Sequence, residues 1–143
     1  VVYTTSLIVP KMLKNKWGRI INVTSVSVKE PLNYLVLSNS IRSAVVAWAK
    51  SLSVDVGKDG VTVNSILTGY FDTERIKDLN KEKSKSLNIS EDEVLEKMKS
   101  LVPINRLGKT EEYGYLVSFL SSDKAAYING ASIPIDGGLL KSY

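Results

Sequence analysis

Chemistry in this chain has to come from hydroxyl, carboxylate, ammonium and guanidinium groups, because its 143 residues include no cysteine and no histidine. The missing cysteines exclude disulfides and thiolate catalysis. The missing histidines exclude serine–histidine triads and remove the commonest metal ligand and the usual acid–base group at neutral pH. We therefore expect no metal site, and we expect any catalytic residue to be Ser, Tyr, Lys, Arg, Asp or Glu.

Ser25 stands where a hydroxyl that touches substrate is expected. It follows residues 19–23, a β-branched run that predicts a buried strand. Ligands of open α/β sheets bind at the carboxyl ends of the strands. The Ser25 hydroxyl can hydrogen-bond a substrate carbonyl or alcohol, and Ser27 is the fallback. The alternative is that Ser25 only satisfies backbone groups of its loop.

Helices and strands are expected to alternate around these candidates. A first helix is expected to stop near Gly18, which suits a left-handed helix end. Residues 24–37 hold Pro31 and show no clear period, so they are expected to be mostly loop, and Ser38 or Asn39 can cap the next helix. The expected helices cover residues 3–13, 39–56, 72–101 (with a capping box at 90–93) and 110–121, and the expected strands cover 19–23, 61–67 and 132–138.

This alternation predicts parallel β–α–β units. We expect the fold class to be α/β: a partial Rossmann-like, doubly wound parallel sheet in three α/β/α layers. Three strands make a thin sheet, and a parallel sheet needs helices on both faces and further neighbours. We therefore expect partner strands to lie outside these residues. The start at Val1, without an initiator methionine, leads to the same expectation.

In this order the segments resemble the short-chain dehydrogenase/reductase family over nearly the whole chain. Residues 18–25 (GRIINVTS) resemble the family's fifth strand, which ends in the substrate-binding serine, and residues 59–66 (DGVTVNSI) resemble its sixth. The later matches are Thr68-Gly69-x-x-x-Thr73 for the family's Pro-Gly-x-x-x-Thr, 103–112 (PINRLGKTEE) for its lid-to-helix segment, 120–130 (LSSDKAAYING) and 136–138 (DGG).

The resemblance implies an NAD(P)-dependent oxidoreductase that moves hydride between nicotinamide and a carbonyl or alcohol, as 3-oxoacyl-carrier-protein reductases do. Ser25 matches the family's serine, and the family's Tyr-x-x-x-Lys falls on Ser38 and Arg42. A serine is a far weaker acid than a phenol, whose pKa is ~10. Arg42 keeps the positive charge, although arginine and lysine are not equivalent donors. The expected catalytic residues are Ser25, Ser38 and Arg42, the last two on one helical face.

The resemblance leaves the proton donor open. Tyr34, in the loop before Ser38, and Tyr70, beside Gly69, are the candidate tyrosines, and water is the third candidate. The alternative for both tyrosines is ordinary aromatic packing.

The resemblance also implies a contact with NAD or NADP. Thr68, Gly69, Phe71 and Thr73 match the loop that touches the nicotinamide amide and the pyrophosphate, and Arg42 can grip ribose hydroxyls. Thr68 replaces the family's proline, which loosens the turn. The alternative is a plain strand-to-helix connection.

The family order implies that the dinucleotide-binding half lies upstream of Val1. Its glycine-rich phosphate turn, its ribose-selecting residue and its Asn-Asn-Ala-Gly segment have no match in these residues. We therefore expect residues 1–143 to be the C-terminal part of one domain, with 72–102 as lid helices, and to be inactive alone.

Composition restricts the partners. The net charge is +4, and Lys is mixed with Glu and Asp, most densely over residues 77–99, which favours a solvated face over a nucleic-acid patch. No apolar run approaches the ~20 residues of a membrane span, and the start lacks the basic region of a secretory signal. We expect a cytoplasmic protein with a small-molecule carbonyl or alcohol substrate, and neither nucleic acid nor membrane as a partner.

Three functions remain open at this point. The first is an active reductase, the second a cofactor-binding relative with little or no turnover, and the third a structural half-domain that works by assembly. In the family, helices corresponding to residues 1–13 and 39–56 pack between subunits, so we expect a homo-oligomer, a dimer or a tetramer.

Overall fold

The structure is a computed structural model that describes residues 1–33 and 35–142. Tyr34, one of the candidate proton donors, therefore lies outside the described residues. In chain order the elements are α1 (Val2–Asn15), β1 (Gly18–Val23), the 3₁₀ turn η1 (Val26–Val28), α2 (Val36–Gly57), β2 (Val61–Thr68), α3 (Glu74–Leu87), α4 (Glu91–Ser100), α5 (Thr110–Ser121), the 3₁₀ turn η2 (Asp123–Ala125) and β3 (Ser132–Ile135).

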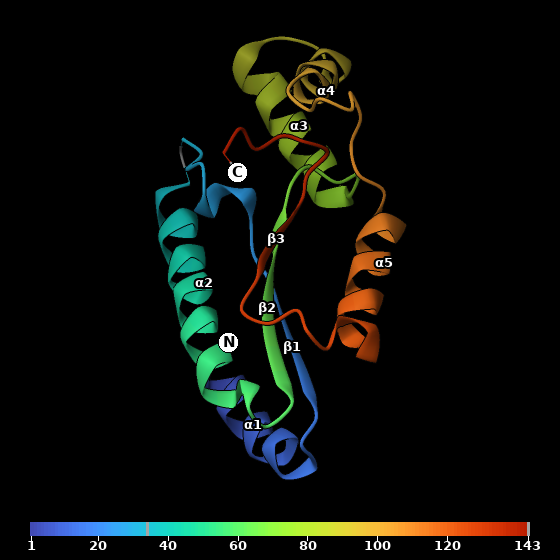
Figure 1. The fold of residues 1–143 in the computed structure, drawn as a ribbon. Helices are drawn as coiled ribbons and strands as arrows, with labels where there is room; N and C mark the ends of the chain where they lie inside the picture. Colours follow the sequence, from blue (N-terminus) through green and yellow to red (C-terminus); the bar gives the residue numbers. More distant parts are fainter. Residues whose placement is uncertain (34, 143) are drawn as a thin grey trace.

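The strands form one parallel sheet in the order β1-β2-β3, between a layer of α1 and α2 and a layer of α5 (Figure 1). Ile20 of β1 pairs with Val63 of β2, and Ile66 of β2 pairs with Ile133 of β3. This confirms the α/β class and the Rossmann-like parallel sheet. The central strand β2 is buried along all but its last residue, as expected for a parallel strand that is covered on both faces.

Side chains of the sheet alternate between the two helical layers. Val61 and Val63 pack against α1 and α2, whereas Ile66 packs against α5. These three side chains are fully buried, and each is worth about 1.5–3 kcal/mol of burial free energy. The β1-to-β2 connection runs through α2 on one face of the sheet, and the β2-to-β3 connection runs through α5 on the other face. Because each strand is added on the same side of the one before it, the two crossovers have opposite handedness. One of them is therefore left-handed, although roughly 98% of such parallel crossovers are right-handed.

The end of α1 differs from the prediction. Lys16, not Gly18, adopts the left-handed conformation, with φ 50°, and its N–H donates to the carbonyls of Leu13 and Met12. Gly18 is instead the first residue of β1. A Cβ built there would lie 2.6 Å from the sulfur of Met12. A glycine is therefore required at position 18 because α1 packs closely on the sheet there. The local sequence pattern does not reveal this contact.

The start of α2 also differs. The helix begins at Val36, and its N-cap, Leu35, makes no side-chain cap. Ser38 and Asn39 therefore do not cap it. The Asn39 amide donates to the carbonyl of Leu32 at 2.9 Å and ties the preceding loop to the helix instead.

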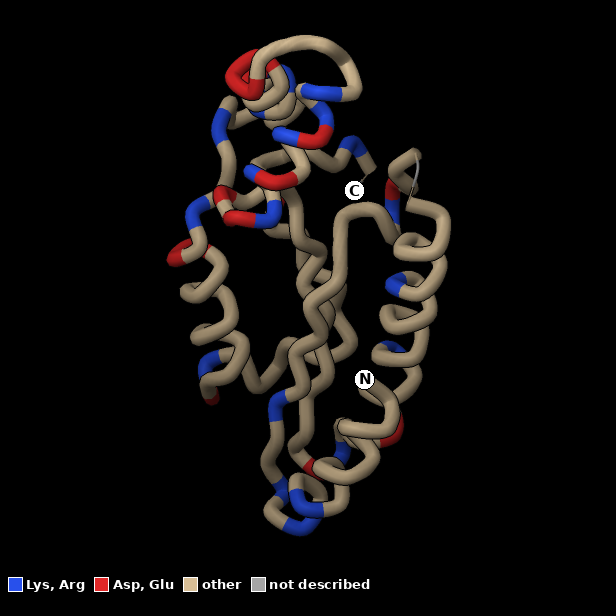
Figure 2. The backbone as a smooth tube through the Cα atoms, turned by 180° about the vertical axis from the view of Figure 1, so that it is seen from behind, with Lys and Arg blue, Asp and Glu red and all other residues tan. Residues whose placement is uncertain are grey.

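The charged segment forms two helices, α3 and α4, above the carboxyl ends of the strands (Figure 1). The predicted capping box is confirmed: the Glu93 N–H donates to Ser90 Oγ and the Ser90 N–H donates to the Glu93 carboxylate. Basic and acidic residues are mixed along α3, whereas α4 has its acidic residues mainly in the first turn and its lysines in the last turn (Figure 2). Among the described residues we find no helix long and apolar enough to span a membrane.

Candidate active site

Three chain segments leave the sheet at one edge, because its strands are parallel. Ser25 follows β1, Thr68 ends β2 and Asp136 follows β3. The N-terminal half of α2 and the two helices α3 and α4 lie at the same end (Figure 1). This is the edge where open α/β sheets bind their ligands.

Ser25 is the N-cap of η1. Its hydroxyl oxygen accepts a hydrogen bond from the Ser27 N–H at 3.1 Å. That bond uses one lone pair, so the hydroxyl proton can still be donated to a carbonyl oxygen. Ser27, the fallback, is only 1% exposed. The structure therefore presents Ser25 at the edge and buries Ser27.

Ser38 and Arg42 contact each other on α2. The Arg42 Nε donates to Ser38 Oγ at 3.2 Å, and its Nη1 donates to the carbonyl of Val23 at 3.3 Å. Val23 is the last residue of β1, two positions before Ser25. The guanidinium thus reaches the strand end that carries Ser25, although the described residues show no direct hydrogen bond between Ser25 and Arg42.

The loop after β2 is fixed mainly through backbone. The Gly69 N–H donates to the carbonyl of Ile135, and Gly108 both donates to Tyr70 and accepts from Asp72. A Cβ on Gly69 would lie 2.6 Å from the Cα of Asp136. A glycine is needed there because the loop passes so close to the end of β3.

Thr68, Phe71 and Thr73 meet around one hollow. It measures about 240 Å³, and its walls are Thr68, Phe71, Thr73, Thr110 and Tyr113. Thr73 also caps α3, because its oxygen accepts a hydrogen bond from the Ile76 N–H. Three of the four residues predicted in this loop to touch a cofactor therefore line a single space.

Tyr113 of α5 is the residue of this hollow that the sequence analysis missed. Its hydroxyl is 3.2 Å from the Thr68 hydroxyl, and its ring meets Phe71 edge-on, with centroids 5.3 Å apart. Burial raises the pKa of Tyr113, while the hydrogen bond to Thr68 and the positive charge of Arg42 oppose that rise. The phenol therefore stays protonated at neutral pH. The sequence analysis placed it only within the expected helix over residues 110–121.

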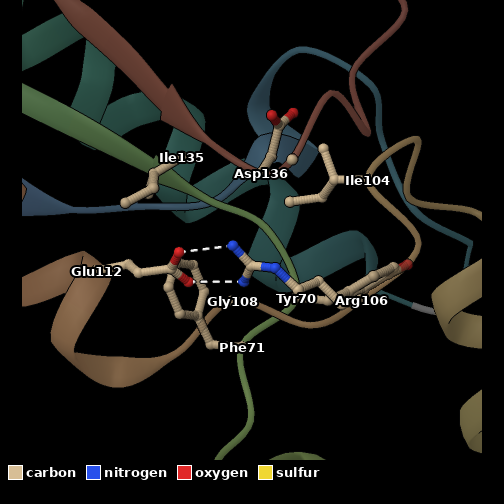
Figure 3. Close-up of a pocket in the computed structure, with 9 residues that line it drawn as sticks. Tyr70, Phe71, Ile104, Arg106, Gly108, Glu112, Ile135 and Asp136 are labelled. Atoms are coloured by element: carbon tan, nitrogen blue, oxygen red, sulfur yellow. Dashed lines mark hydrogen bonds and ion pairs between the residues drawn. The ribbon is translucent and has the colours of Figure 1, made fainter.

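A second cavity, of about 280 Å³, lies between the ends of β2 and β3 and the start of α5 (Figure 3). Arg106 and Glu112 form a bidentate ion pair in the wall of this cavity, with N–O distances of 2.8 and 2.6 Å. The Arg106 guanidinium, helped by the Lys109 N–H, lowers the pKa of Glu112 to about 2. The guanidinium and the carboxylate pair with each other, so this ion pair fastens the loop that carries Arg106 to α5.

Tyr70, a candidate proton donor, also lines this cavity. Burial raises the pKa of its phenol, which makes it a weaker acid than a solvated tyrosine. Its position favours packing between the loop and the lid helices.

The loop that carries Ser25 is tied to the far end of the chain. The backbone N–H groups of Lys141 and Ser142 both donate to one oxygen of Glu30, each at 2.8 Å. These bonds lower the pKa of the Glu30 carboxyl. The C-terminal segment is thereby held against the loop that follows Ser25.

Comparison with known proteins identifies the family. Residues 1–140 match the family model described as Enoyl-(Acyl carrier protein) reductase. The chain is 33% identical to the NADPH-dependent reductase BacG of Bacillus subtilis, over 92% of this chain and 51% of that protein. It is 32% identical to the 3-oxoacyl-[acyl-carrier-protein] reductase FabG of Pseudomonas aeruginosa, over 92% of this chain and 49% of that protein.

A solved structure agrees with the sequence matches. L-sorbose reductase from Gluconobacter frateurii, in complex with NADPH and L-sorbose, superimposes with a TM-score of 0.91 at 30% identity, over 99% of this chain and 54% of that one. The chain thus spans about half the length of the relatives it matches. With a matching family model over almost every residue and the parallel sheet that carries its motifs, the chain belongs to the short-chain dehydrogenase/reductase family.

Proposed function

We propose that these residues supply the substrate edge of an NAD(P)-dependent oxidoreductase that interconverts a small carbonyl compound and its alcohol. The observation that carries the proposal is the meeting of Ser25, Arg42 and the Thr68–Thr73 loop at one end of a parallel sheet. The relatives whose names include an NADPH-dependent reductase and a sugar reductase support it. We propose NAD or NADP as the cofactor.

The side chains present fit the nicotinamide end of such a cofactor. The hollow beside Thr68, Phe71 and Thr73 is lined by apolar surface and has one aromatic wall, which suits the flat face of a nicotinamide ring. The 143 residues contain no Gly-x-Gly-x-x-Gly turn that could cradle the pyrophosphate. The proposal therefore concerns these residues together with a dinucleotide-binding half.

Each predicted catalytic residue has a role in this proposal. The nicotinamide supplies the hydride when it is bound. Ser25 donates its hydroxyl proton in a hydrogen bond to the substrate oxygen, and Arg42 stabilises the negative charge that develops there and binds ribose hydroxyls. Ser38, held by Arg42 Nε, donates its hydroxyl proton to that oxygen, because no phenol stands at its position. It regains a proton from a neighbouring water molecule, and the hydroxide so formed takes a proton from bulk solvent when the lid opens. Residues 72–102 form a lid that excludes bulk water.

The test uses the full-length natural protein that carries this sequence. NADPH and NADH binding is measured by fluorescence, and their oxidation is followed with a panel of small aldehydes and ketones. We expect Ser25→Ala and Arg42→Ala to lower kcat about 100-fold or more while both variants keep their circular dichroism. Turnover that survives both changes would overturn the catalytic roles.

A cofactor-binding protein with little turnover is the second candidate, and the missing phenol favours it. The same experiment separates the two, since that protein would bind NADPH or NADH without oxidising it. The 143 residues alone are the control: tight NADH binding by them would show that a separate dinucleotide half is not needed.

We also propose a homo-oligomer, a dimer or a tetramer. The outer surface of α2 exposes Val36 (77%), Leu37 (73%), Ile41 (56%) and Val54 (73%). Apolar surface of this kind marks an interaction site when it is contiguous. Light scattering of the full-length protein, with Leu37→Glu and Val54→Glu as the disrupting changes, tests the assembly. A monomer before any substitution would refute it.

A further inference from the structure

Tyr113 contacts the loop after β2 at two points. Its hydroxyl bonds to Thr68, the last residue of β2. Its ring packs on Phe71, three residues later, which also pairs with Gly108. Gly69 and Tyr70 lie between these two contacts. One side chain from α5 therefore fixes the segment that leads from the sheet to the lid helix.

Thr68 is already held on one side by the sheet. It is the last residue of β2 and lies opposite Ile135, and the next residue, Gly69, donates its N–H to the Ile135 carbonyl. A proline at this place would also fix φ by its ring, whereas a threonine leaves φ to these contacts. The hydroxyl contact to Tyr113 adds a tie from the Thr68 side chain to α5.

The pair also borders the proposed site. The side chains of Thr68 and Tyr113 line the same hollow as Thr73, while their hydroxyl groups bond to each other. The pair thus links β2 and α5 at the edge where a nicotinamide would lie.

We propose that Tyr113 is a positioning residue that sets the Thr68–Thr73 loop for cofactor binding through its hydrogen bond to Thr68, in the place of a proline ring. This inference rests on the proposed function, since it assigns Tyr113 to the cofactor side of that site. It predicts that the phenol is dispensable once a proline stands at position 68.

The experiment compares four forms of the full-length protein: wild type, Tyr113→Phe, Thr68→Pro and the double variant. Dissociation constants for NADPH and NADH are measured by fluorescence titration. We expect Tyr113→Phe to raise the constant for the preferred cofactor about three- to tenfold, the effect of one lost hydrogen bond. The double variant is expected to return to within about twofold of wild type.

The matched control is Tyr115→Phe, on the same helix but 72% exposed, which should change nothing. Thr68→Val removes the Thr68 hydroxyl without introducing a proline ring, and it should weaken cofactor binding as much as Tyr113→Phe does. If Thr68→Pro does not fold, the valine variant replaces it in a double-mutant cycle. In that cycle, adding Thr68→Val to Tyr113→Phe should cause no further loss of cofactor affinity.

Amide hydrogen exchange of residues 69–72 provides a readout that needs no cofactor. We expect faster exchange in Tyr113→Phe than in Tyr115→Phe. Equal exchange and equal cofactor affinity would overturn the positioning role and leave the proposed function standing. A wild-type protein that binds neither nucleotide would overturn the proposed function, and faster exchange would then show that Tyr113 holds the loop for another purpose.

Discussion

The two sides of the candidate site are built by different means. On the β1 side, Arg42 reaches from α2 to Ser38 and to the end of the strand through long side-chain contacts of 3.2 and 3.3 Å. On the β2 side, the loop is fixed by backbone hydrogen bonds and by a glycine packed against β3. The first side can change its chemistry without changing the fold, whereas the second side cannot.

The largest effect is expected where the chemistry depends on one charge. Arg42→Ala should lower kcat about 100- to 1000-fold and, with the loss of its two hydrogen bonds, lower the unfolding free energy by about 1 kcal/mol. Steady-state kinetics and urea unfolding measure both. Arg42→Lys is the control, because it keeps the charge and should retain part of the activity. A large loss of stability would show that this side is structural after all.

Restoring the family's residue pair sharpens the same comparison. The double variant Ser38→Tyr/Arg42→Lys supplies a phenol beside an ammonium group four residues away. A positioned general acid contributes about 10²–10⁴, and we expect a gain in kcat of about tenfold or more over wild type. Single variants, assayed in parallel, should gain less. An unchanged kcat in the double variant would show that proton transfer does not limit turnover.

On the β2 side the expected loss is in stability. Gly69→Ala would force a Cβ to within 2.6 Å of the Asp136 Cα, and overpacking of this kind costs about 1–3 kcal/mol. Gly114→Ala is the matched control, because a Cβ there meets nothing within 4 Å in the interior of α5. That change should stabilise the protein by about 0.5–1 kcal/mol. Urea unfolding of both variants gives the contrast directly.

The smallest effect concerns pH. Because Arg106 lowers the pKa of Glu112 from 4.5 to about 2, the ion pair stabilises the fold above pH 4.5, and this contribution is lost as pH falls towards 2. Since the pair is exposed, the change is expected to be small. Arg106→Gln should flatten the fall of the melting temperature over that range. Lys77→Gln, which removes an exposed pair on α3, serves as the comparison.

Sequence reasoning reached the sheet and the strand ends because both follow from short-range patterns. The buried run before Ser25 needed only the strand period, whereas Ser38 and Arg42 were placed by the resemblance to the family's Tyr-x-x-x-Lys pair. Gly18 and Asn39 were misread because their roles depend on Met12 and on the Leu32 carbonyl. Tyr113 was missed for the same reason: its hydroxyl partner stands 45 positions away, and nothing local distinguishes a tyrosine that packs from one that bonds.

The two amides held by Glu30 have a practical consequence for labelling. A fluorophore attached to the Lys141 side chain would be coupled to the loop that follows Ser25, so its signal should report events at the substrate edge. The same dye on Tyr127, which is fully exposed, would be expected to stay silent. One carboxylate therefore makes residues 141–142 a natural place for a sensor of the substrate edge.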